Sequence, residues 1–378
     1  LVFFPQVLIS ESLLEHQDPR TNELALEAFQ NILAFMGDLP FALGSELDSV
    51  HRILEICEEE AHLPDEVYCQ ILKQLTYTRS PKRDACFKAW QLLYILTACH
   101  RCSEQLQPTL ELYLKTVGRH RQDAMHDIAR ACYQQLKRVE KIGARVHYPS
   151  IMEIKALKVG HSLQWIFVTI PGGFRLPVKI NMATIILDIF QVLCARLSVT
   201  KKEEKQDYGI FYGTNLDSLH RLLQPTAYVL DILQDVEAED SSASLWFCRT
   251  HWSYPLRYEK QLCVSMQYHQ VLQLYQTGQL LMRKEHSPIS QAEQASRLAA
   301  LKHRATGASH PPNRVEMKDL IPTDIWLMFE ERYWMEQVTA GMKELLRSAI
   351  TPFQAKSQFL EIISSLPMLG SSLLEIAR

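Results

Sequence analysis

The chain lacks any apolar run that could cross a bilayer, and neither end has the basic and then apolar layout of a secretory signal. The apolar opening at 1–9 is interrupted by Pro5 and is much too short to span a membrane. Every later apolar run is broken by a charge, so we expect no transmembrane segment. The first residue is Leu1 and not methionine, which leads us to expect a fragment.

The sequence also lacks the short motifs that carry phosphate binding or catalysis. It contains no Gly-x-x-x-x-Gly-Lys, no Gly-x-Gly-x-x-Gly, no Gly-x-Ser-x-Gly and no His-Glu-x-x-His. The glycine pair Gly172 and Gly173 joins two predicted strands, so it is predicted to form a turn and not a phosphate cradle. We therefore expect no catalytic residues, no cofactor and no enzymatic activity in this chain.

Metal-ligand spacing is missing as well. The nine cysteines have no regular spacing, which favours reduced thiols over disulfides. Cys99-His100-Arg101-Cys102 is the one cluster that resembles a site, but a structural zinc needs four ligands and no second Cys-x-x-Cys completes the set. His120 and His126 do not share a helix face. We predict thiols at a helix end and no metal site.

The charge balance excludes a strong overall field. The 378 residues are 47% hydrophobic and 22% charged, which is enough for two or three cores, and the net charge of −3 gives no reason to expect nucleic acid as a partner. The charges are nevertheless asymmetric. Residues 1–60 carry 12 acidic and 2 basic residues, whereas 61–145 carry 14 basic and 8 acidic residues.

Basic residues gather in two places within this region. One group is Lys73, Arg79, Lys82, Arg83 and Lys88; the other is Arg119, Arg121, Lys137, Arg138 and Lys141. A solvated face that balances the acidic one is the simpler interpretation. The alternative is that the first group, from Lys73 to Lys88, is a docking patch for an acidic polymer such as the microtubule surface.

Hydrophobic periodicity predicts a multidomain, mainly α protein with one α+β lobe. Helical patterns cover 24–36, 50–57, 67–75, 89–98, 106–117 and 124–139, which indicates an all-helical bundle. Strands are predicted at 165–170, 174–180, 208–212 and 245–248, with a helix from about 184 to 197. Helices return at 264–276, at 290–307 after a capping box at Ser290–Glu293, at 324–346, and from 352 onward.

The stretch 64–76 carries the most specific signal. Val67, Ile71 and Leu75 form an apolar stripe, with Tyr68 beside them, and a polar stripe of Gln70, Lys73 and Gln74 is predicted opposite. The letters Asp65-Glu-Val-Tyr-Cys-Gln-Ile-Leu-Lys-Gln-Leu-Thr76 resemble the signature helix of the myosin tail homology domain of unconventional myosins. Phe35-Met36-Gly37-Asp38, and the helix from Trp90 followed by 110–115, match further blocks of that family in order.

Downstream, a hairpin, a helix and further strands resemble the ubiquitin-like first lobe of a FERM domain, a β-grasp fold. The helices after 251 resemble its second, acyl-CoA-binding-protein-like lobe. The resemblance implies an N-terminal segment at 1–20, a myosin tail homology domain at 21–146, a linker at 147–160, a first lobe at 161–250, a second lobe at 251–364 and an incomplete third lobe at 365–378.

The family motif residues are expected to be structural. They are Phe35, Met36, Gly37, Asp38, Asp65, Glu66, Tyr68 and Gln70. Gly37 is expected to serve a backbone role at a helix end and Asp38 a capping or turn role. Trp90, Trp165 and Phe174 are expected in the core.

The resemblance implies a non-catalytic tail module, closest to the class fifteen myosins and less close to classes seven and ten. Its expected partners are cargo or scaffold proteins and microtubules, with actin contacted only by a motor domain outside this chain. The expected location is cytoplasmic and cytoskeletal, in actin-rich protrusions. A motor-free FERM scaffold and a kinesin tail with the same tandem remain alternatives.

Overall fold

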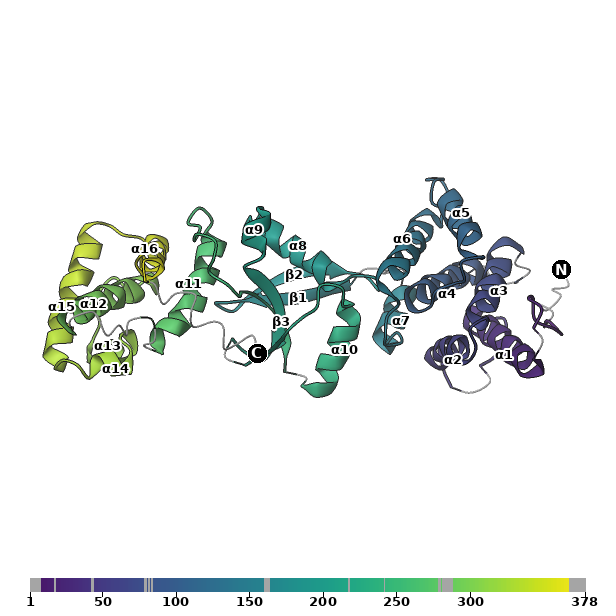
Figure 1. The fold of residues 1–378 in the computed structure, drawn as a ribbon, viewed down its shortest axis with the longest axis horizontal. Coiled ribbons are helices and arrows are strands. Elements are labelled where there is room, and N and C mark those ends of the chain that lie inside the picture. The colour runs from purple at the N-terminus through teal and green to yellow at the C-terminus, as the bar shows by residue number, and fades with distance from the viewer. Residues whose placement is uncertain are drawn as a thin grey trace. The chain divides into compact units, whose positions relative to one another are not determined.

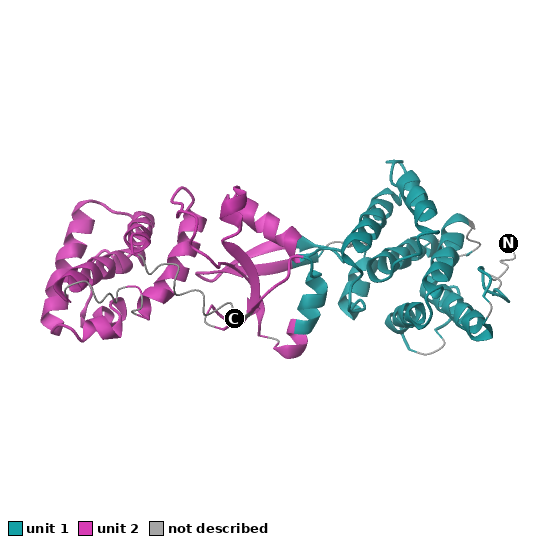
Figure 2. Ribbon diagram, viewed as in Figure 1, with its two compact units in different colours: residues 1–165, 179–185, 226–235 teal, residues 166–178, 186–225, 236–378 magenta. Residues whose placement is uncertain are grey.

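A computed structural model describes residues 8–16, 18–41, 44–77, 80, 82, 84–159, 164–216, 218–240, 242–277, 280 and 288–366. The chain divides into two compact units (Figure 2). The first comprises 1–165, 179–185 and 226–235, and the second comprises 166–178, 186–225 and 236–378. The predicted class is confirmed, since the fold is mostly helical with one small mixed sheet (Figure 1).

Seven helices precede the first strand in the described part of the chain. They are α1 (Pro19–Met36), α2 (Glu46–Glu59), α3 (Leu63–Tyr77), α4 (Ala85–Cys99), α5 (Gln107–Val117), α6 (His126–Ile142) and α7 (Ile151–Lys158). Helix α4 is the central element, because twelve of its fifteen residues are buried. Trp90 of this helix is 2% exposed and stacks on Tyr113 of α5, with ring centroids 5.8 Å apart.

Helix α7 occupies most of the segment that the sequence predicted as a linker. Ser150 and Glu153 form a capping box at its start, in which the Ser150 hydroxyl accepts a hydrogen bond from the Glu153 N–H. The side chain of Gln91 in α4 donates to the Leu157 carbonyl, so α7 is fastened to the bundle. Residues 151–158 are therefore a helix attached to the bundle and not an extended linker.

The sheet has the order β2-β1-β5-β3-β4. Its elements are β1 (Gln164–Ile170), β2 (Phe174–Ile180), α8 (Ile186–Leu197), α9 (Lys202–Lys205), β3 (Tyr208–Gly213), β4 (Leu219–Leu222), α10 (Val229–Glu239) and β5 (Ser244–Arg249). Strands β1 and β5 are parallel, and β3 is antiparallel to both β4 and β5. This is the ubiquitin-like arrangement that the sequence predicted.

The turn between β1 and β2 needs its two glycines. Gly172 and Gly173 have φ values of +97° and +80°, in the left-handed region that side chains disfavour. Strand β2 lies at the edge of the sheet, so Pro177, which has no N–H to donate, is accommodated there.

Two aromatic residues expected in the core are exposed, and that prediction is wrong. Trp165 is 58% exposed and Phe174 is 43% exposed. Alternation along β1 places Val168 and Ile170 on the buried face and Trp165 on the opposite one. The Lys179 ammonium lies 5.0 Å from the centre of the Trp165 ring, a cation–π contact that partly covers the indole.

The helices after the sheet pack around one apolar core. They are α11 (Gln261–Gln276), α12 (Pro288–Ala305), α13 (Arg314–Leu320), α14 (Thr323–Trp326), α15 (Glu331–Arg347) and α16 (Pro352–Ser364). Tyr268, Tyr275 and Phe359 meet edge to face within this core. Thr351 caps α16 and Pro352 occupies its first turn, as the sequence predicted.

Two helix predictions in this lobe are wrong. Helix α12 begins at Pro288, so Ser290 lies inside its first turn and does not cap it. The single helix predicted at 324–346 is broken between α14 and α15. The break lets the Trp334 indole N–H donate to the Trp326 carbonyl at 3.0 Å and lets the two rings stack. The interruption between α14 and α15 therefore allows the two tryptophan rings to pack together.

Residues 367–378, which include most of the predicted start of a third lobe, lie outside the described residues. No described helix combines the length and apolar character that a membrane crossing requires.

Candidate functional site

The signature helix α3 directs polar side chains at backbone groups of other segments. Asp65 Oδ1 accepts a hydrogen bond from the Ser103 N–H at 2.7 Å. The Tyr68 hydroxyl, which is fully buried, donates to the His100 carbonyl at 2.9 Å. Both contacts hold the loop that follows α4.

Glu66 and Gln70 make the second set of contacts. The N–H groups of Leu13 and Leu14 donate to the two carboxylate oxygens of Glu66, each at 2.8 Å. Gln70 Nε2 donates both to Glu66, at 2.7 Å, and to the Ala25 carbonyl of α1, at 2.8 Å. Glu66 is fully buried, so these donors compensate for its lost hydration.

The predicted polar face of α3 is wrong for two of its three residues, because they are buried. Gln70 and Gln74 are 0% and 2% exposed, and only Lys73 is exposed. Helix α3 packs against α1, α2 and α4, so little of its circumference reaches solvent. The Gln70 amide nitrogen is paired with two acceptors, whereas its amide oxygen has no hydrogen-bond partner among the described residues.

The second motif block, Phe35-Met36-Gly37-Asp38, lies at the C-terminal end of helix α1. Phe35 and Met36 are 2% and 0% exposed in its last turn. Gly37 follows with φ +85°, and the Asp38 N–H reaches back to the Leu33 carbonyl at 2.8 Å. A left-handed glycine with this hydrogen bond is a common helix C-terminal motif. The structure thus places these residues at a chain reversal.

Side chains from the segment before α4 meet this reversal. The Ser80 hydroxyl donates to Asp38 Oδ1 at 2.5 Å, and the Lys82 ammonium donates to the Gly37 carbonyl. A cation at the carbonyl end of a helix is favourable because the last carbonyls carry partial negative charge. Lys82 therefore supports the fold as well as carrying charge at the surface.

The structure describes three of the five residues of the predicted basic patch. Lys73 and Lys82 are exposed, and Lys88 is half-buried. The Lys88 ammonium lies 3.7 Å from an Asp84 oxygen and 4.0 Å from a Glu46 oxygen, so its charge is largely compensated. Arg79 and Arg83 lie outside the described residues.

The second basic group is also partly neutralised. The Lys137 ammonium contacts Glu111 at 2.8 Å and Glu140 at 2.7 Å. The hydrogen bond from Lys137, with further donors from Gln107 and Lys115, lowers the pKa of Glu111 to about 2. Arg119, Arg121 and Lys141 are exposed.

Sequence reasoning missed a buried ionic cluster after α6. The Arg145 side chain is 0% exposed, and its guanidinium lies 2.6 Å from a Glu153 oxygen and 2.8 Å from an Asp231 oxygen. The other Asp231 oxygen accepts from the Val146 N–H at 2.8 Å. Sequence patterns could not reveal this cluster, because Asp231 follows 86 residues after Arg145.

Neighbouring contacts extend the same junction. The Gln234 amide donates to the Tyr148 carbonyl at 3.2 Å and to Glu153 at 3.1 Å. The Tyr228 hydroxyl donates to the Gly143 carbonyl at 2.7 Å. The first turns of α10 and the residue before it are thereby attached to the segment between α6 and α7.

The thiols are not arranged for nucleophilic chemistry. All nine cysteines are among the described residues and are free. Burial raises the pKa of Cys99 to about 12 and that of Cys102 to about 11, and burial lowers the pKa of His100 between them. Protonated thiols are poor nucleophiles.

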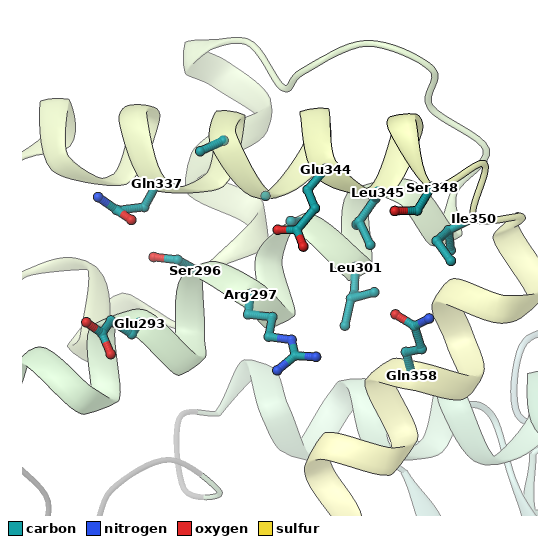
Figure 3. Close-up of a pocket in the computed structure, with 13 residues that line it drawn as sticks. Glu293, Ser296, Arg297, Leu301, Gln337, Glu344, Leu345, Ser348, Ile350 and Gln358 are labelled. Carbon is teal, nitrogen blue, oxygen red and sulfur yellow. The ribbon is translucent and has the colours of Figure 1, made fainter.

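The second unit contains a polar groove of about 600 Å³ between α12, α15 and α16. Arg297 extends from α12 into the opening, Glu344 and Leu345 of α15 face it from above, and Gln358 of α16 borders it (Figure 3). Helices α12 and α15 approach closely, since a Cβ added to Gly341 of α15 would lie 3.1 Å from the Cβ of Ala300 in α12. The groove offers both signs of charge to a polar ligand.

Two family models match separate parts of the chain. A model of the MyTH4 domain matches residues 50–156, and a model of the FERM central domain matches residues 255–373. The first match begins within α2 and ends within α7, and the second covers α11 to α16.

Individual relatives point the same way. Human unconventional myosin-XV is 35% identical over 98% of this chain and 10% of its own length. Human unconventional myosin-XVB is 29% identical over all of this chain and 12% of its own length. The chain thus spans about a tenth of these relatives.

The fold also matches a solved structure. This is the C-terminal MyTH4-FERM domain of human myosin 7b in complex with a harmonin-a PDZ3 domain, with a TM-score of 0.68 and 22% identity. The match covers 96% of this chain and 74% of the solved chain.

Proposed function

Because the chain carries the MyTH4–FERM tandem of unconventional-myosin tails, we propose that it is a cargo-binding and cytoskeleton-binding module of an actin-based motor. The observation that carries the proposal is the alignment with human unconventional myosin-XV along 98% of this chain. The myosin 7b relative is solved in complex with a PDZ domain. We propose a scaffold protein of that kind as the partner.

We further propose that this chain has no ATPase site and that actin is contacted by a motor domain outside it. The polar residues of the family motifs support this, since they bind backbone groups of their own fold. The boundaries 21–146, 161–250 and 251–364 are proposed for the tail homology domain and the two lobes. The proposed location is the actin-rich protrusions of the cell.

The cargo role can be tested by fusing this chain to a motile myosin motor. The fusion is expected to concentrate a co-expressed PDZ scaffold, such as harmonin-a, at protrusion tips. The motor alone is the control. If neither harmonin-a nor any other scaffold protein of protrusions follows the fusion beyond the control, the cargo role is wrong.

A microtubule role is proposed for Lys73, Arg79, Lys82, Arg83 and Lys88. The exposure of Lys73 and Lys82 supports it. Binding of this kind is expected to weaken with salt, since exposed charges are screened over about 8 Å at physiological ionic strength. Cosedimentation with microtubules at low and high salt measures the effect.

The variants need care because Lys82 also caps α1. We therefore change Lys73, Arg79 and Arg83 to Glu and leave Lys82 and Lys88 in place. Changing the exposed residues Lys318, Lys343 and Arg347 to Glu gives a control of equal charge. The first variant is expected to lose binding at low salt and the second to keep it; equal binding by both would remove the patch from consideration.

A further inference from the structure

Three metal-ligating side chains converge where helix α12 ends in the second unit. They are His303 of α12, His310 of the following loop and Glu316 of α13. One ring nitrogen of each histidine and one carboxylate oxygen of Glu316 all lie within 4.8 Å of one another. His303 is 5% exposed, Glu316 is half-buried and His310 is exposed.

The two imidazoles already have one nitrogen occupied. His303 Nε2 lies 3.1 Å from the His310 carbonyl oxygen, and His310 Nδ1 lies 2.9 Å from the Pro311 carbonyl oxygen. A carbonyl can only accept, so in the neutral imidazole these nitrogens carry the proton and the lone pair belongs to the other nitrogen of each ring. Metal-binding histidines commonly have this arrangement, in which a backbone carbonyl fixes the tautomer.

The carboxylate is positioned independently of any ligand. Asn313 and Glu316 form a reciprocal capping box, in which one Glu316 oxygen accepts from the Asn313 N–H at 2.8 Å. The other oxygen is not needed for the cap. Glu316 is therefore oriented by the start of α13 and retains capacity to bind a cation.

The cluster borders a hollow of about 610 Å³, which also receives Asp319 and Lys302. Lys302 is the one group lining this hollow that opposes a cation. Its ammonium donates to the Asp319 carbonyl, so a backbone oxygen holds it in place. Asp319 contributes an acidic residue to the same lining.

We propose that His303, His310 and Glu316 form a zinc site that joins the end of α12 to the start of α13. Two imidazoles and a carboxylate are a ligand set that Zn²⁺ binds, with a water molecule as the fourth ligand. Zinc bonds of about 2.0–2.1 Å place tetrahedral ligands about 3.3 Å apart, so the loop at 306–313 must tighten on binding. The site is independent of the cargo function proposed above.

There is a physical reason why the sequence pattern does not show this zinc site. His303 is separated from His310 by the turn at Gly307, which has φ +99°, and the spacing follows no helical zinc motif. The ligands become neighbours only because α13 returns toward the end of α12.

Zinc titration of the chelator-treated chain by calorimetry tests the proposal. We expect one ion per chain, with affinity weakened at least about tenfold in His310→Gln and in Glu316→Gln. Both variants are suited to the test because His310 is exposed and glutamine preserves the capping box. His62→Gln, at an exposed histidine of the first unit, is the matched control and is expected to bind as the parent chain does.

Cobalt substitution distinguishes this site from binding by cysteines. The bound Co²⁺ is expected to lack the sulfur-to-cobalt charge-transfer band that thiolate ligands produce. Three results would each overturn the proposal: no zinc binding at micromolar concentration, unchanged affinity in His310→Gln and Glu316→Gln, or a thiolate band in the cobalt spectrum. Thermal unfolding without zinc checks that each variant is folded.

Discussion

Arg145 and Asp231 are separated by 86 residues in the sequence, and their side chains form a buried ion pair in which Nε lies 2.8 Å from Oδ1. Glu153 shares the guanidinium, and the Val146 N–H occupies the second Asp231 oxygen. Both carboxylate oxygens of Asp231 thus bind the segment between α6 and α7. We infer that the cluster fixes the start of α10 on that segment.

Asp231→Ala is expected to destabilise this junction strongly. The substitution leaves Arg145 paired with Glu153 alone and removes the acceptor of the Val146 N–H, at a cost of about 1–3 kcal/mol. Urea unfolding measures the loss, and amide exchange at Val146 reports it locally. Asp235→Ala is the control, because the Asp235 side chain is 50% exposed and its contact with His147 is worth about 0–1 kcal/mol. Equal losses in the two variants would show that the buried cluster has no special role.

Glu66→Ala is expected to release the N-terminal segment from α3. The substitution leaves the N–H groups of Leu13 and Leu14 without their acceptors and costs on the order of 3 kcal/mol. Limited proteolysis is expected to cut within 8–16 faster than in the parent chain. Glu23→Ala, at an exposed position of α1, is expected to leave the cleavage rate unchanged. Unaltered cleavage in Glu66→Ala would contradict the predicted role.

Gly37→Ala is expected to lower the unfolding free energy by about 2 kcal/mol. A side chain at φ +85° costs about 1 kcal/mol, and the new Cβ, 3.1 Å from the Lys82 ammonium, displaces the hydrogen bond to the Gly37 carbonyl. Gly307→Ala separates these two effects. Gly307 has φ +99°, and a Cβ added there would meet no atom within 4 Å, so only the backbone cost of about 1 kcal/mol applies. If denaturant unfolding shows the same loss of unfolding free energy in Gly37→Ala and Gly307→Ala, Lys82 makes no contribution.

The ion pair of Glu111 and Lys137 predicts a loss of stability in acid. The hydrogen bond from Lys137 lowers the pKa of Glu111 to about 2. Because the folded pKa lies below the unfolded value of about 4.3, the stabilisation is complete above that value and is lost as the pH falls toward 2. Solvent screening limits the effect to about 1 kcal/mol.

Unfolding measured from pH 7 to pH 3 tests this prediction. Glu111→Gln is expected to reduce the slope of stability against pH between about 5 and 3, because the titrating group is gone. Glu104→Gln, at an exposed position, is the control. The same slope in Glu111→Gln and the parent chain would show that other carboxylates account for the acid sensitivity.

Local patterns in the sequence were sufficient for most of the secondary structure. Val67 and Ile71 are buried, as their spacing in α3 predicts, and the glycine turn between β1 and β2 is where the alternation on either side placed it. One prediction that failed, Ser290 as a helix cap, concerns the competition between local signals. Helix α12 begins at Pro288, because the fixed φ of proline already suits the first turn of a helix.

The sequence by itself indicated most of the described helices and four of the five described strands, although not, for example, α7, α10 or β4. It also indicated the family through short blocks such as 65–76. Tertiary structure alone decided that Gln70 is buried, that Trp165 is exposed, and that Arg145 meets Asp231. The same holds for His303, His310 and Glu316, which come from three successive segments. The reason is physical: periodicity reports the face of one element, whereas burial, ion pairing and metal ligation depend on which other segments pack against that face.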